Sequence, residues 1–206
     1  QSFEAAPVVA APPAQVVAFA DDLYQTQDLT LFGLDAIAAV NFPRPSAWTL
    51  TEDPELHLAL DHSAMLDTGR SSLTIKVNGV ALHTLRLDDT NAVNGRVVVP
   101  LPRRVLEDHN RIQFEASQHV DRACEDPYDP ALWTRILSSS SIHFYRSEDP
   151  TDASLSSFPD LLFDPTGLGP LRLTLAGQGP LTESTLDALG RVGLSLGRHA
   201  GYRGLT

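Results

Sequence analysis

The chain has 206 residues, of which 42% are hydrophobic and 20% are charged. These ordinary globular values exclude a disordered acidic tail, a coiled coil and a collagen-like rod. The chain has 15 Lys and Arg residues and 26 Asp and Glu residues, so the formal net charge is −11. Such an acidic chain repels phosphate backbones, and we therefore expect no nucleic acid among its partners. No apolar stretch approaches the ~20 residues that cross a bilayer.

The first 15 residues are rich in Ala, Val and Pro and carry no Lys or Arg. This composition is not that of an intact signal peptide, and it predicts an extended tether of the kind that follows a cleaved one. The single cysteine excludes both a disulfide-rich scaffold and a thiolate zinc site.

A period of two dominates residues 16–148, which predicts one β domain. Asn78 and Gly79 lie between two alternating runs, as in a two-residue hairpin whose turn positions both take positive φ. Pro100 predicts an edge strand or a strand end. Phe42, Phe114 and Phe144 fall in strand patterns and are expected in the core. The predicted strands cover residues 28–34, 36–42, 55–61, 72–77, 80–87, 96–101, 111–116 and 140–145.

Eight short strands of this kind are typical of an antiparallel β-sandwich, and we expect a jelly-roll topology. Residues 117–139 form an insertion that does not follow this regular series of short strands. Within this insertion, residues 130–137 begin with Pro130 and are expected to form one or two helical turns.

Composition changes after residue 148. Residues 149–170 hold Asp, Ser and four prolines and read as a linker. A strand over residues 171–175 and a helix over 182–199, with Thr182 as its capping residue, would form the first β–α unit of an α/β domain, here residues 171–206. One such unit cannot bury its own faces, so we expect the sequence to be a piece of a longer protein. Gly177 and Gly179 are better explained by an ordinary strand-to-helix turn than by a phosphate cradle.

Two polar groups are candidates for chemistry. His57, Asp61 and His62 fit solvent-facing strand positions better than a metal site, because His62 points away from the other two on a strand. The insertion carries the densest polar cluster, which consists of His119, Asp121, Cys124, Glu125 and Asp126. A nucleophilic cysteine needs a cationic neighbour, whereas three carboxylates surround this one. We expect no catalytic residue, no metal and no cofactor.

Trp133 lies in the insertion beside Tyr128 rather than in a predicted strand. An indole on a loop can stack on the apolar face of a sugar ring, while Asp126 and Asp129 could accept hydrogen bonds from sugar hydroxyls. The alternative is a small satellite core beneath the loop, which spacing alone favours.

Several ordered motifs resemble the family of periplasmic regulatory subunits of bacterial cellulose synthase. They are CEDPYDPALWTRILSSSSIHFY (residues 124–145), KVNGV (76–80), PLPRRVLEDHN (100–110) with IQF (112–114), and FPD (158–160). The helix and Gly201-Tyr-Arg203 are similar to the start of that family's next domain.

The resemblance implies a carbohydrate-binding-type jelly roll followed by the start of a flavodoxin-like domain. It also implies a non-catalytic periplasmic subunit that supports the membrane glycosyltransferase and guides the nascent β-1,4-glucan. Other copies of the chain are possible partners, and contact with the inner membrane would come only through a C-terminal anchor beyond these residues. The family carries a cyclic di-GMP name, but the acidic charge argues against a nucleotide site here.

The resemblance also bears on two residues. Trp133 matches a family tryptophan that faces the glucan, which moves the balance toward sugar contact. Cys124 matches a family cysteine that pairs with one in the following domain, which implies a disulfide to a cysteine outside this chain. The rival interpretation is a structural or oligomerisation module that binds no sugar.

Overall fold

The computed structural model describes residues 14–44, 48–121, 125–148 and 182–199. They form twelve strands, one short 3-10 turn and one helix. The strands are Gln15–Ala18 (β1), Leu29–Phe32 (β2), Asp35–Pro43 (β3), Trp48–Leu50 (β4), Glu55–His62 (β5), Ser72–Val77 (β6), Val80–Arg86 (β7), Gly95–Pro100 (β8), His109–Ser117 (β9), Trp133–Ile136 (β10), Ser141–Phe144 (β11) and Arg146–Glu148 (β12). The 3-10 turn is Arg103–Val105 and the helix, α1, is Glu183–His199.

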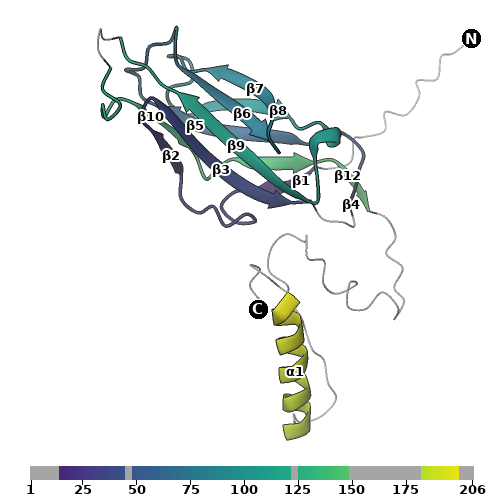
Figure 1. Cartoon of the computed structure of the whole chain (residues 1–206). Helices are drawn as coiled ribbons and strands as arrows, with labels where there is room; N and C mark the ends of the chain where they lie inside the picture. The colour runs from purple at the N-terminus through teal and green to yellow at the C-terminus, as the bar shows by residue number, and fades with distance from the viewer. Residues whose placement is uncertain (1–13, 45–47, 122–124, 149–181, 200–206) are drawn as a thin grey trace, which may run out of the picture.

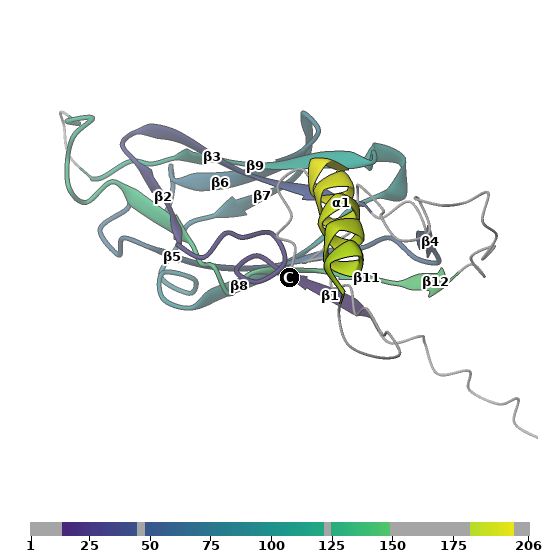
Figure 2. The same cartoon turned by 90° about the horizontal axis from the view of Figure 1, so that it is seen from below.

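Ten of the strands form two antiparallel sheets that lie face to face (Figures 1 and 2). The first sheet has β5 at its centre. β8 pairs with one edge of β5, and β11 and β10 share the other edge, each followed by an outer strand, β1 or β2. The second sheet has the order β3-β9-β6-β7. A small ribbon of β4 and β12 extends one end.

The core lies between the two sheets because each strand turns one set of alternate side chains inward. Strand β6 is a clear case, with Leu73, Ile75 and Val77 all buried. The expected core residues Phe42, Phe114 and Phe144 are confirmed at 1% exposure or less. Mainly antiparallel β structure is therefore confirmed, while the jelly-roll connection order stays a prediction.

The hairpin at Asn78-Gly79 is also confirmed. Val77 pairs with Val80 and Lys76 with Ala81, and the two turn residues have φ values of 50° and 83°. The asparagine tolerates this left-handed conformation and the glycine takes it without a Cβ penalty. Pro100 ends β8, which is an edge strand as predicted.

The helical turns predicted for residues 130–137 are wrong. Part of this segment is strand β10, which pairs with β2 on one side and β5 on the other. Thr134 and Ile136 are buried while Trp133 and Arg135 are half-exposed, so the period is two. The segment can pair with β5 on one side and β2 on the other. This strand pairing stabilises it more than one or two isolated helical turns would.

The predicted helix at residues 182–199 is confirmed as α1. The Thr185 backbone N–H donates to Thr182 Oγ1 at 3.3 Å, which confirms the expected cap. The predicted tether, linker and strand at 171–175 lie mostly or wholly outside the described residues, and the flavodoxin-like assignment stays a prediction. Among the described residues, no helix is both long and apolar enough to cross a membrane.

Candidate functional site

Trp133 is the first residue of strand β10 rather than part of an irregular loop, which corrects its predicted setting. Its direct partner on the neighbouring strand β2 is Phe32. Residues directly opposite one another in an antiparallel pair point to the same face of the sheet. Phe32 is 49% exposed and Trp133 is half-buried. The two rings therefore form a cross-strand aromatic pair on the outer face of the six-stranded sheet.

Polar side chains lie on the same face of the sheet, two residues further along the strands. Arg135 pairs with Thr30 of β2 on one side and with Asp61 of β5 on the other. The Arg135 guanidinium carbon lies 5.5 Å from the centre of the Trp133 ring, which is a cation–π distance. We call Phe32, Trp133, Arg135, Thr30 and Asp61 the aromatic patch. It combines apolar ring faces with a donor, a hydroxyl and a carboxylate, the mixture that sugar rings require.

Tyr128 lies in the loop that leads into β10. Its side chain is 81% exposed, and its N–H donates to Asp126 Oδ1 at 2.9 Å. The loop is placed against the end of β2, because the Gly33 N–H donates to the Leu132 carbonyl at 2.9 Å. A Cβ on Gly33 would lie 3.3 Å from the Pro127 carbonyl oxygen, and the φ of +102° there also favours glycine. Tyr128 therefore belongs to the segment next to the aromatic patch.

The four residues predicted to contact sugar therefore lie in different environments, some exposed and one buried. Trp133 and Tyr128 are accessible, and Asp126 is exposed with one oxygen holding the turn. Asp129 is only 6% exposed, and its Oδ1 accepts the Ala131 N–H at 2.9 Å. A buried carboxylate that closes the turn before β10 is poorly placed for a sugar hydroxyl. Phe32 was missed, although the alternation of residues 28–34 already turned it away from the core.

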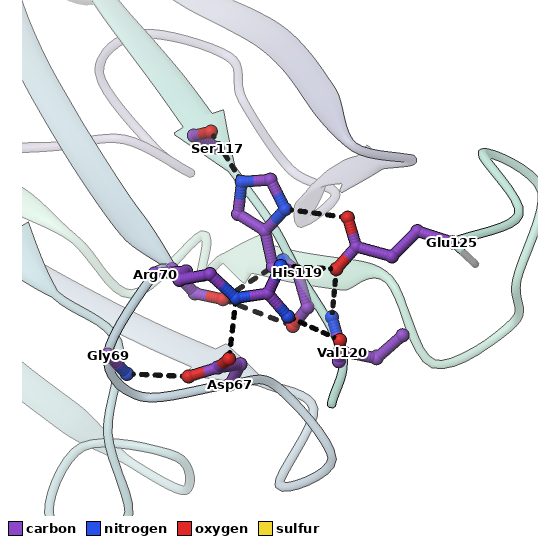
Figure 3. A network of polar contacts seen from close by, with 8 residues as sticks. Asp67, Gly69, Arg70, Ser117, His119, Val120 and Glu125 are labelled. Atoms are coloured by element: carbon purple, nitrogen blue, oxygen red, sulfur yellow. Dashed lines mark hydrogen bonds and ion pairs between the residues drawn. The ribbon is translucent and has the colours of Figure 1, made fainter. Parts of the chain in front are cut away.

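The predicted polar cluster is in part a network of ion pairs (Figure 3). Glu125 Oε2 lies 2.9 Å from His119 Nδ1, and its Oε1 lies 3.1 Å from Arg70. Arg70 also pairs with Asp67 at 2.6 Å and donates to the Val120 carbonyl at 2.7 Å.

The bond from His119, assisted by the charge of Arg70, lowers the pKa of Glu125. The Arg70 guanidinium, with the Gly69 N–H, lowers the pKa of Asp67. Both carboxylates are held ionised by partners, so neither is poised as a general acid near neutral pH. The network fastens His119, Val120 and Glu125 to the loop at 66–71. Cys124 lies outside the described residues, and its disulfide stays a prediction.

The second predicted polar group is not solvent-facing throughout. His62 is buried at 3% exposure, and its Nε2 lies 2.7 Å from Asn91 Oδ1, which corrects the expectation of an exposed position. His57 instead stacks on His143, with ring centres 3.7 Å apart. Burial, followed by the charge of His57, lowers the pKa of His143. In the described part of the chain, no three His, Cys, Asp or Glu side chains are arranged to hold a metal ion.

Comparison with known proteins identifies relatives of this domain. A cyclic di-GMP-binding protein of Xanthomonas axonopodis pv. citri (strain 306) is 30% identical over 180 residues, which are 86% of this chain and 22% of the relative. A protein of the same description from Pseudomonas fluorescens (strain SBW25) is 25% identical over 86% of this chain and 24% of its own length. Cellulose synthase 2 of Novacetimonas hansenii is 24% identical over 86% of this chain and 11% of its own length.

The chain therefore spans at most about a quarter of the length of these curated relatives. The model of the family described as "Cellulose synthase BcsB, first CBM domain" matches residues 14–148. This range runs from the residue before β1 to the end of β12 and holds every described strand. The chain belongs to the family of the first CBM domain of cellulose synthase BcsB.

Proposed function

We propose that this chain is part of a non-catalytic, periplasmic subunit of a cellulose synthase complex, and that its aromatic patch contacts the β-1,4-glucan product. The family match carries the first half of the proposal. The cross-strand pair of Phe32 and Trp133 on an outer sheet face carries the second. In this proposal the catalytic glycosyltransferase is the partner, and any attachment to the inner membrane comes from parts of the protein beyond these residues.

The geometry of the patch suits a sliding polymer. Two aromatic residues in register on adjacent strands place apolar ring surface on the outer face, and in this proposal a glucan chain lies across it while its hydroxyls reach Arg135, Thr30 and Asp61. The Asp61 carboxylate is fixed because its Oδ1 accepts the Asn94 N–H at 2.7 Å. Every sugar contact competes with water, so one platform of this size binds weakly, on the order of millimolar. Weak contact lets the product move on.

Tryptophan fluorescence tests the proposal directly. The chain has two tryptophans, so a Trp48→Phe background leaves Trp133 as the reporter. Cellohexaose should change its emission with a millimolar dissociation constant, and Phe32→Ala should weaken that constant by about fivefold or more. Ile37→Ala is the matched control, since Ile37 is 65% exposed on β3 of the other sheet.

A separate titration, followed by NMR, should show Trp133→Ala binding cellohexaose at least about fivefold more weakly than the unchanged chain. Circular dichroism must show that the variant remains folded. Unchanged emission and unchanged spectra up to high millimolar cellohexaose would favour the rival, an interaction module that binds no sugar.

A further inference from the structure

Two asparagines of the chain are followed by glycine, in the sequences Asn78-Gly79 and Asn94-Gly95. Asparagine before glycine is the sequence that deamidates most readily, because the glycine has no side chain to hinder its backbone nitrogen. That nitrogen attacks the side-chain carbonyl carbon of the asparagine. The two asparagines share a left-handed backbone conformation, with φ values of 50° and 52°. They differ in the contacts that their side chains make.

The side chain of Asn78 is held at both ends of its amide. Nδ2 donates to the Val105 carbonyl at 2.8 Å and to Asn110 Oδ1 at 2.9 Å, and Oδ1 accepts the Arg111 N–H at 2.9 Å. Deamidation requires the amide to turn toward the glycine nitrogen and Nδ2 to leave as ammonia. All three hydrogen bonds must break before this can happen, so the folded structure protects Asn78.

The side chain of Asn94 is exposed and makes no hydrogen bond to another described residue. Its backbone N–H donates to Asp61 Oδ1 at 2.7 Å, which fixes the main chain and leaves the side-chain amide free to rotate. Gly95 pairs with Leu60, and this pair is the last one of the β5–β8 ladder. Opening at the end of a ladder frees the Gly95 nitrogen while the rest of the strand stays paired.

The fold also requires glycine at position 95. A Cβ on Gly95 would lie 2.4 Å from the Asn91 carbonyl oxygen, and real Cβ atoms essentially never come so close. The turn into β8 therefore keeps an unhindered backbone nitrogen directly after Asn94, because a larger residue does not fit there.

We propose that Asn94 is a site of spontaneous deamidation in the folded chain and that Asn78 is protected from the same reaction. The Gly95 nitrogen forms a bond to Asn94 Cγ, its proton passes to solvent, and the side-chain nitrogen leaves as ammonia. Water then opens the succinimide ring at either carbonyl, which leaves aspartate or isoaspartate at position 94. The net reaction consumes one water and releases one ammonia, and it needs no oxidant or cofactor.

The product carries a new negative charge beside the aromatic patch, because the Asn94 N–H is the donor that fixes Asp61. An aspartate tolerates the left-handed φ at this position, so we expect the deamidated chain to stay folded. Isoaspartate in addition lengthens the main chain by one methylene just before β8. The consequence for sugar contact rests on the proposed function, whereas the modification site itself does not.

Mass spectrometry of the whole chain tests the proposal. The chain is incubated at mildly alkaline pH in water labelled with ¹⁸O and is then digested in ordinary water, so that only conversion during the incubation carries the label. Trypsin separates the two sites into peptides 77–86 and 87–96, because it cleaves after lysine and arginine. Asn94 should convert at least about tenfold faster than Asn78, with isoaspartate among its products.

Two controls separate structure from sequence. In guanidinium chloride both side chains lose their contacts, so the two asparagines should convert at similar rates. In the Asn94→Ala variant, peptide 87–96 should stay unmodified, which assigns the change to Asn94 rather than to Asn91.

Three results would overturn the proposal. The first is equal conversion of the two asparagines in the folded chain, which would mean that the contacts of Asn78 give no protection. The second is a rate difference that persists in guanidinium chloride, which would make it a property of the local sequence. The third is aspartate without isoaspartate at position 94, which would indicate direct hydrolysis instead of attack by Gly95. A failure of sugar binding at the aromatic patch changes none of these outcomes.

Discussion

Glu125 joins two segments that are far apart in the sequence, since its carboxylate contacts Arg70, His119 and the Val120 N–H. These partners lower its pKa in the folded state. A carboxyl group whose pKa is lowered on folding stabilises the native state fully above its unfolded pKa. That contribution is lost as the pH falls through the folded pKa. The network should therefore hold at neutral pH and release in acid.

We expect Glu125→Gln to lower the melting temperature at pH 7 and to have less effect as the pH falls below about 4.5. The neutral amide cannot form the two ion pairs, whereas in strong acid the native residue is itself protonated. Thermal unfolding by circular dichroism between pH 3 and 8 measures this. Glu107→Gln is the control, because Glu107 is exposed and has no ion pair among the described residues. A melting-temperature difference that stays constant down to pH 3 would contradict the assignment.

At the level of single residues, only part of the candidate site could be predicted from the sequence. Trp133 was singled out because it fell outside the expected strands, yet it lies in one. Phe32 was overlooked because its place beside Trp133 depends on the register of β2 against β10. Register between distant segments is a tertiary property, set by which faces are buried. A short-range pattern could show that Phe32 points outward, but not which aromatic residue lies next to it.

Among the elements, the hairpin of β6 and β7 has the strongest local determinants. Its turn residue Asn78 takes a left-handed φ of 50° and uses its whole side-chain amide. Nδ2 donates to the Val105 carbonyl at 2.8 Å and to Asn110 Oδ1 at 2.9 Å, and Oδ1 accepts the Arg111 N–H at 2.9 Å. One side chain thereby joins the hairpin to the 3-10 turn and to the start of β9.

Asn78→Ala should lower the free energy of unfolding by about 2 to 4 kcal/mol, because it removes these hydrogen bonds and places a Cβ-bearing residue without a helpful amide at positive φ. Asn94→Ala is a matched control. Asn94 has the same kind of φ, 52°, but is exposed, and its side chain makes no hydrogen bond within the described ranges. It should cost about 1 to 2 kcal/mol, the backbone part alone. Urea unfolding of both variants gives the difference, and equal losses would show that the amide contacts contribute nothing.

The four strands that escaped prediction are all short, whereas β2 and β11, which have four residues each, were predicted within longer alternating runs. β1, β4, β10 and β12 have three or four residues each, too few for an alternating pattern to stand out from chance. The predicted strands of six or more residues all exist, because a long run must keep one face apolar to be buried. β10 was mistaken for helix because Pro130 suited the first position of a helix, whereas the pairing with β5 and β2 exists only in the assembled sheet.

At the scale of the whole molecule, one core accounts for the β domain. Its buried apolar side chains run from Val17 to Phe144, which matches the extent of the family, residues 14–148. The described residues of α1 contribute no buried side chain. The change in composition after residue 148 predicts the domain's end there, and this boundary stays a prediction; the last described strand of the domain, β12, ends at Glu148. The predicted start was residue 16, whereas β1 begins at Gln15.

We therefore expect a chain trimmed to residues 14–148 to unfold cooperatively within about 2 °C of the full chain, since every core residue that the structure describes is retained. Far-UV circular dichroism should meanwhile lose the helical signal of α1.

Starting the trimmed chain at residue 20 should have a severe effect. It removes Val17 and Phe19, which are 1% and 0% exposed, and leaves β11 without its pairing to β1. Burying two such side chains is worth roughly 3 to 6 kcal/mol, a large part of the stability of an ordinary domain. Differential scanning calorimetry of the 14–148 and 20–148 chains measures the difference. If both melted together, β1 would be a passive addition to the sheet, and the boundary of the folding unit would lie after Phe19 rather than before Gln15.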